Sequence, residues 1–136
     1  MRIQWTIDSE EPLDPVDPLG SLTFEDELGH SFSAVSIYLD DWFDALLNGI
    51  EQIECGKRDV QVSLLTEPDV IQFSEHQAIC SISYKGKVVS VGNIVDFKNE
   101  LRSQIRSVMA VFQRDSNLSD YANWLNAVNF LKSGAT

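Results

Sequence analysis

The sequence predicts an α+β fold, a mostly antiparallel sheet with about three helices packed on one of its faces. Two observations support this. Alternating apolar and polar residues, typical of strands, fill much of the chain before Asp40 and again its middle part. Apolar residues at intervals of three and four, typical of helices, follow Asp41 and recur from Phe97 onward. The strands are close in sequence, so antiparallel pairing is the simplest arrangement.

The length indicates one domain. A chain of 136 residues has the common single-domain size, so we expect residues 1–136 to fold together. Such a chain buries enough surface to fold without a metal or a disulfide. Cys55 and Cys80 lie outside any C-x-x-C spacing. We therefore expect free thiols, with Cys80 acting as a small buried residue of a strand.

Three strands are expected before the first helix, over residues 2–7, 21–24 and 31–39. In the third, alternation places Phe32 and Ser36 on one face and Ile37 on the other. Residues 8–20, which contain three prolines and several acids, are expected to form an extended, exposed loop.

The first helix is expected to begin at Asp40 and Asp41, whose carboxylates can cap its start. Gly56 is a natural left-handed residue for its end. An apolar stripe along the helix comprises Phe43, Leu46, Leu47, Ile50 and Ile53.

Four more strands are expected in the middle of the chain, over residues 60–65, 70–73, 78–84 and 88–91. A polar link at residues 74–77 separates the second of these from the third. A short hairpin connection at residues 85–87 joins the last two.

After residue 95 the apolar residues recur at intervals of three and four instead of two. Asp96 is expected to cap a long helix, and a second, shorter helix is expected around residues 121–131. Lys98, Arg102 and Arg106 form a basic stripe, expected to be solvated or to pair with acids of the segment 1–54. The long helix has an apolar stripe of Phe97, Leu101, Ile105, Val108, Met109 and Phe112.

Negative charge is concentrated at the start of the chain. The formal net charge is −11; residues 1–54 hold thirteen acids and one base, Arg2, whereas residues 55–136 hold eight acids and nine bases. Such a field repels nucleic acid and anionic lipid and attracts a basic surface. We therefore expect a protein partner and no nucleic-acid or membrane binding, although the same charge would also serve solubility alone.

No catalytic motif is present. The sequence lacks G-x-S-x-G and both glycine-rich phosphate motifs, and His30 and His76 are not spaced as metal ligands. We expect no catalytic residue, no metal and no cofactor. The first residues do not form a signal peptide, and no apolar run approaches the ~20 residues that span a bilayer. The expected location is therefore the cytoplasm.

The central part of the chain carries a resemblance to a known group of proteins. The relevant segments are YLDDWFDALLNGI at residues 38–50, LLTEP at residues 64–68 and VDFKNELR at residues 95–102. Over roughly residues 35–112 the sequence resembles the small immunity proteins of bacterial polymorphic-toxin and contact-dependent inhibition systems. This resemblance implies an inhibitor without catalytic residues that neutralises a cognate toxin, often a nuclease, by covering its active site.

An acidic surface can occupy the basic groove of a nuclease. Trp42 or Tyr38 could anchor such a contact, although either could equally belong to the core. The alternatives are an adaptor or oligomerising subunit that binds a basic protein and a small enzyme with a scattered site; the oligomeric state stays open. The predicted partner-binding acids are Glu25, Asp26, Glu27, Asp40, Asp41, Asp44, Glu51 and Glu54.

Overall fold

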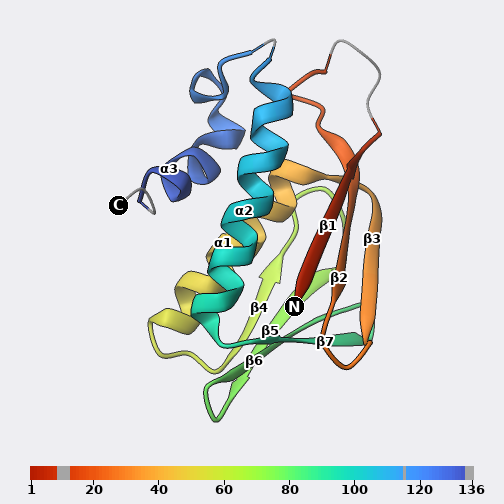
Figure 1. Cartoon of the computed structure of the whole chain (residues 1–136), viewed down its shortest axis with the longest axis vertical. Coiled ribbons are helices and arrows are strands. Elements are labelled where there is room, and N and C mark those ends of the chain that lie inside the picture. The colour runs from red at the N-terminus through yellow and green to blue at the C-terminus, as the bar shows by residue number, and fades with distance from the viewer. Residues whose placement is uncertain (9–12, 115, 134–136) are drawn as a thin grey trace.

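A computed structural model of the protein describes residues 1–8, 13–114 and 116–133. In these residues, seven antiparallel strands form two sheets, which pack together with three α-helices (Figure 1). The α+β class is thus confirmed. The strands are divided between two sheets rather than belonging to a single one, and a helix lies in the sequence between the third strand and the fourth.

The first sheet has the order β1-β2-β3, formed by β1 (Arg2–Ile7), β2 (Leu19–Glu25) and β3 (Ser31–Tyr38). The segment between β1 and β2 differs from the prediction of an exposed loop, of which residues 9–12 lie outside the described part. Leu13, Pro15 and Pro18 are buried. The indole N–H of Trp124 donates a hydrogen bond of 2.8 Å to the Pro15 carbonyl, so this segment is tied to the C-terminal region.

The predicted alternation fails in the middle of β3 because the strand contains a bulge. Leu22 of β2 pairs with Ala34. Gly20, two residues earlier, pairs with Ile37 rather than with Ser36. The extra residue places Ser36 at a positive φ of 53° and brings Ile37 to the buried face. Our assignment of strand faces is therefore wrong from Ser36 onward.

Helix α1 (Leu39–Glu54) follows β3 directly. Its N-cap is Tyr38, whose side chain makes no capping hydrogen bond, so the prediction that Asp40 and Asp41 cap the helix is wrong. Both aspartates lie in its first turn, where negative charge suits the helix dipole. Gly56 follows the last residues of α1 with a φ of +102°, as predicted. The predicted apolar stripe is buried, except that Leu47 is only half-buried.

The second sheet has the order β4-β5-β6-β7, formed by β4 (Asp59–Ser63), β5 (Val70–His76), β6 (Ile79–Tyr84) and β7 (Lys87–Gly92). The predicted link at residues 74–77 is shorter than expected, because β5 continues through His76. Gln77 and Ala78 alone form the turn, and their φ values of 52° and 65° suit a two-residue hairpin.

Helix α2 (Ile94–Phe112) begins before Asp96, so the prediction that Asp96 caps it is wrong. Asn93 is the cap, and its side-chain oxygen accepts a 2.8 Å bond from the Asp96 N–H. All six residues of the predicted apolar stripe are buried.

The C-terminal region contains two short 3₁₀ turns, η1 (Leu118–Asp120) and η2 (Ala122–Trp124), before helix α3 (Leu125–Ser133). Trp124, Ala127 and Val128 supply its buried contacts, whereas Leu125 is exposed.

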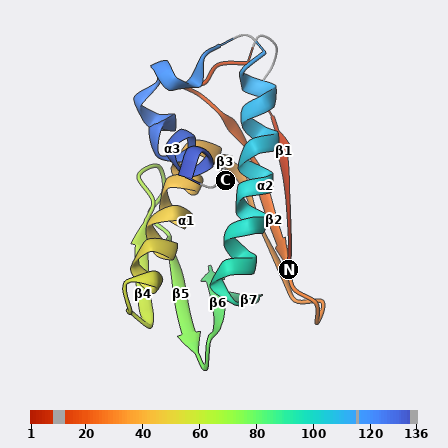
Figure 2. The same ribbon diagram turned by 60° about the vertical axis from the view of Figure 1, so that its left-hand side comes forward.

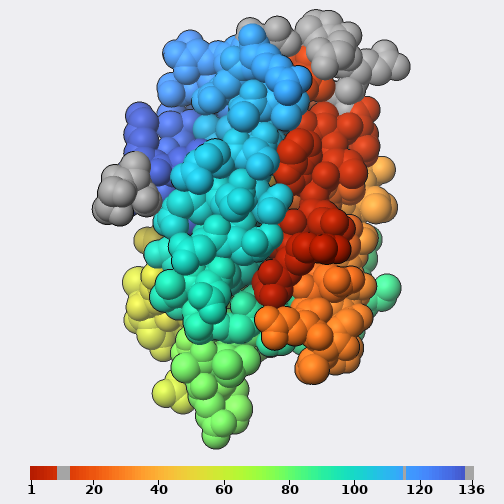
Figure 3. Space-filling model, viewed as in Figure 1, coloured from red at the N-terminus to blue at the C-terminus, as the bar shows by residue number. Residues whose placement is uncertain are grey.

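Helices α1 and α2 each contact strands of both sheets, and in Figure 2 the strands of the first sheet stand beside α2. Helix α1 packs on β4 and β5, and α3 packs on α1 and α2. Helix α2 runs beside β1 at the surface, as Figure 3 shows. Cys80 is buried as predicted, and both cysteines are free thiols. In the described part of the chain, no helix combines the length and apolar character needed to cross a bilayer.

Gly49 sets how closely α1 approaches the second sheet. A Cβ at this position would lie 2.1 to 2.5 Å from three ring atoms of Phe73, a buried residue of β5. Glycine in a helix normally costs about 1 kcal/mol relative to alanine, so the sign of the substitution depends on this contact.

We predict that Gly49→Ala destabilises the protein by about 1–3 kcal/mol, because the methyl group must displace a close-packed ring. Urea unfolding measures the change. Asn48→Ala, at the adjacent position on the outer side of the helix, is the control and should stay within about 0.5 kcal/mol of the wild type. A Gly49→Ala protein as stable as the wild type would show that α1 is not held this closely.

Candidate functional site

A groove of about 710 Å³ lies over the outer face of α1, between β4, α3 and the N-terminal part of α2. Four of the eight predicted acids line it, and we call it the acidic groove. The groove also contains Lys98 and the exposed residue Leu65. The four acids are Asp41, Asp44, Glu51 and Glu54.

Asp41 holds the loop after β4 in place. It is only 7% exposed, and its two oxygens accept bonds of 3.0 Å from the backbone N–H groups of Leu65 and Thr66. The Thr66 hydroxyl donates a third bond of 2.5 Å. Asp41 is therefore a structural residue at one end of the acidic groove, and its carboxylate is already occupied.

Leu65 is 90% exposed although it is a large apolar residue. Because Asp41 binds its backbone N–H, Leu65 is held beside the groove instead of folding into the core. We did not predict this residue. The exposure of Leu65 could have been predicted from the alternation of apolar and polar residues after residue 59, which places Leu65 on the polar face of the strand with Gln61 and Ser63.

Asp40 and Asp44 face the C-terminal region. The side chain of Asn123 donates a 2.6 Å bond to Asp40, and one oxygen of each aspartate is buried without a hydrogen-bond partner. Burial raises the pKa of Asp44 to about 6; a bond from Asn126 opposes this shift, and the charges of Asp40 and Asp41 add to it. Burial likewise raises the pKa of Asp40.

Glu51 and Glu54 are the exposed acids of the groove. The Lys98 Nζ lies 3.0 Å from Glu54 Oε2, which confirms for Lys98 that the basic stripe pairs with an acid of the segment 1–54. Arg102 instead lies over the ring of Phe130, 4.6 Å from its centroid. Glu51 and Glu54 are thus the groove carboxylates most exposed to solvent, and Glu54 already has Lys98 as an ion-pair partner.

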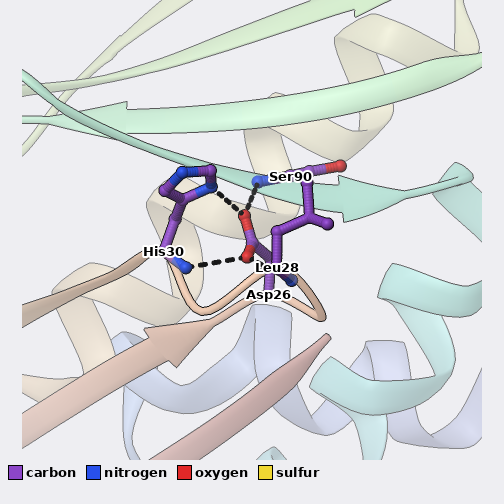
Figure 4. A network of polar contacts seen from close by, with 4 residues as sticks. All are labelled: Asp26, Leu28, His30 and Ser90. Atoms are coloured by element: carbon purple, nitrogen blue, oxygen red, sulfur yellow. Dashed lines mark hydrogen bonds and ion pairs between the residues drawn. The ribbon is translucent and has the colours of Figure 1, made fainter.

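Asp26 is a second buried acid and joins the two sheets (Figure 4). It is 7% exposed, and it accepts bonds from the backbone N–H groups of Leu28 and His30 at 2.9 Å and of Ser90, in β7, at 3.1 Å. Burial alone would raise the pKa of Asp26, but these bonds, together with one from the His30 ring, lower it.

Glu25 and Glu27, which flank Asp26, are exposed and do not join the acidic groove. They lie at the turn between β2 and β3, and in Figures 1 and 2 helix α2 stands between this turn and the C-terminal half of α1. The eight predicted acids therefore form two separate groups. Trp42, considered as an anchor, is fully buried, with its indole N–H directed at Glu67.

Comparison of the chain with protein-family models, with curated proteins and with solved structures finds no match. Within the described residues, no group of three or more His, Cys, Asp or Glu side chains could hold a metal ion.

The raised pKa of Asp44 predicts a pH-dependent stability. Between its ordinary pKa of 3.8 and about 6, the folded chain holds this proton more tightly than the unfolded chain does. Ionisation of Asp44 therefore disfavours folding, with no penalty below pH 3.8 and the full penalty above pH 6.

We predict that Asp44→Asn is more stable than the wild type by about 1 kcal/mol at pH 8, after allowance for solvent screening of this half-buried group. The gain should disappear as the pH falls to 4, as urea unfolding at both pH values would show. Glu51→Gln, which removes an exposed charge of the same helix, should change stability by at most about 0.5 kcal/mol. An equal gain in stability for Asp44→Asn at both pH values would contradict the raised pKa of Asp44.

We also predict that Asp41→Asn destabilises the fold by about 1–3 kcal/mol, because the amide nitrogen that replaces one carboxylate oxygen cannot accept a bond, so the N–H of either Leu65 or Thr66 loses its acceptor. Amide hydrogen exchange should become faster at whichever of these two residues loses its acceptor. Asp120→Asn, at an exposed position of η1, is the control. Unchanged exchange at both Leu65 and Thr66 would show that Asp41 does not hold this loop.

Proposed function

We propose that this protein is an immunity-type inhibitor that binds the basic surface of a toxin domain through its acidic groove and catalyses no reaction. The observation that carries the proposal is the gathering of acids in one groove on α1, with Glu51 and Glu54 exposed in it. A toxin that cleaves nucleic acid needs a positively charged surface for phosphates, and a negatively charged groove is complementary to such a surface.

The charge of the groove suits fast recognition. Asp44, with a pKa of about 6, is mostly ionised at pH 7, and Lys98 is the only basic residue among the described residues that line the groove. Opposite potentials on two proteins accelerate their association and are screened by salt. An inhibitor must reach a toxin before the toxin reaches its substrate, so a steered association rate is a useful property.

Leu65 supplies the apolar part of the proposed contact. Binding energy in protein interfaces comes mainly from a few residues that are fully desolvated in the complex. Leu65 is 90% exposed and its backbone is fixed by Asp41, so burying its side chain costs little backbone ordering. The acids would then determine the orientation of the partner, and Leu65 would contribute to the lifetime of the complex.

The test uses the protein encoded by the gene next to that of this chain, which the proposal requires to be a toxin. We predict that co-expression of this chain restores the growth of cells that express the toxin. In calorimetry, Glu51→Lys with Glu54→Lys should weaken binding at least about tenfold, and raising the salt should weaken the wild-type complex.

The matched control is Glu25→Lys with Glu27→Lys, which changes the net charge equally at the separate acidic turn and should bind as the wild type does. Equal weakening by both pairs would indicate a general charge effect and overturn the groove as the site. A neighbouring gene that encodes no toxin, or a toxin that binds without loss of its toxicity, would contradict the immunity role; the second result would favour an adaptor.

A further inference from the structure

The two sheets have four outer edges, and three of them are covered in the described part of the chain. Helix α2 lies along β1, where Glu100 accepts a 3.1 Å bond from the Ile3 N–H. The edges of β3 and β7 lie beside each other, and Asp26 accepts the bond of the Ser90 N–H between them. The fourth edge, the outer edge of β4, is not covered by any described residue.

The register shows which backbone groups of β4 face outward. The Glu75 N–H donates to the Arg58 carbonyl at 2.8 Å, so these two residues form a hydrogen-bonded pair. Such pairs alternate along antiparallel strands, which directs the backbone groups of Val60 and Val62 toward β5. The N–H and C=O groups of Asp59, Gln61 and Ser63 therefore point away from the sheet, and no described residue pairs with them.

The free edge of β4 ends at Ser63, because the backbone N–H groups that follow are already hydrogen-bonded. Asp41 occupies the N–H groups of Leu65 and Thr66, so the free edge is limited to residues 59–63. β4 contains no proline, and its pairing with β5 has no bulge, so neither of these two devices blocks an added strand. A strand of this length, with alternate backbone groups free, can accept one short added strand.

The free edge opens onto the acidic groove. Ser63, at the end of the edge, lines the groove together with Asp44 and Glu51. Asp59 is exposed at the other end. A strand added to β4 would thus run past carboxylates, which are complementary to lysine and arginine side chains. A second copy of this chain carries a net charge of −11, which opposes its approach to the acidic groove.

We propose that β4 binds an extended, lysine- or arginine-rich segment of the partner protein as an additional strand, with backbone bonds to Asp59, Gln61 and Ser63 and basic side chains directed at the acidic groove. This inference deepens the proposed function and rests on it, since it states how the groove would take its partner. Strand addition derives affinity from main-chain bonds and specificity from alternate side chains.

The probe is a short peptide with blocked ends in which lysine and valine alternate. At millimolar peptide, the amide exchange of Asp59, Gln61 and Ser63 should slow, while that of residues 2–7 stays unchanged. Gln61→Pro removes one outward N–H without breaking a bond to β5 and should weaken peptide binding about tenfold, whereas Gln61→Ala, which keeps the N–H, should not.

Exchange at residues 59, 61 and 63 that stays unchanged at millimolar peptide overturns the proposal, and the wild-type measurement decides even where Gln61→Pro fails to fold. Protection of the same amides without peptide, rising with protein concentration, would assign the edge to a second copy and also overturn it. The two proposals fail separately. A toxin that binds Gln61→Pro normally but binds Glu51→Lys with Glu54→Lys weakly would keep the acidic groove as the binding site and overturn the added strand; a toxin that binds both variants normally would overturn the groove as well.

Discussion

The orientation of α1 between the two sheets is the constraint on which the rest of the structure depends. Its apolar stripe is buried against β4 and β5, and Gly49 lets the helix approach the ring of Phe73. Once that face is buried, the side chains on the opposite face of α1 point outward. Glu51 and Glu54 are therefore exposed because the other face of α1 is packed into the core. The acidic groove lies over this outer face of the helix.

Acidity in a sequence is not the same as acidity at a surface. Asp26 and Asp41 belong to the acidic first part of the chain, yet both are almost fully buried and satisfied by backbone N–H groups. Asp26 connects the two sheets, and Asp41 connects α1 to the loop after β4. A buried carboxylate bound in this way orders loops, and here it fixes the position of Leu65.

Local patterns predicted most elements, and long-range contacts account for what they missed. The stripe from Phe97 to Phe112 was predicted in full, because helical periodicity is a local property. The caps were misplaced by a few residues, since Asn93 and Asp96 both suit a helix start and only the geometry distinguishes them. The bulge at Ser36 and the bond from Ser90 to Asp26 depend on partners distant in sequence, which periodicity does not reveal.

The account depends on the acidic groove being the surface that meets a basic partner. The most direct measurement is a map of backbone amide shifts by nuclear magnetic resonance as the neighbouring toxin domain is added. The account predicts that the largest changes fall on Glu51, Glu54 and Leu65. Changes centred on Glu25 and Glu27 instead, or none in α1, would contradict it.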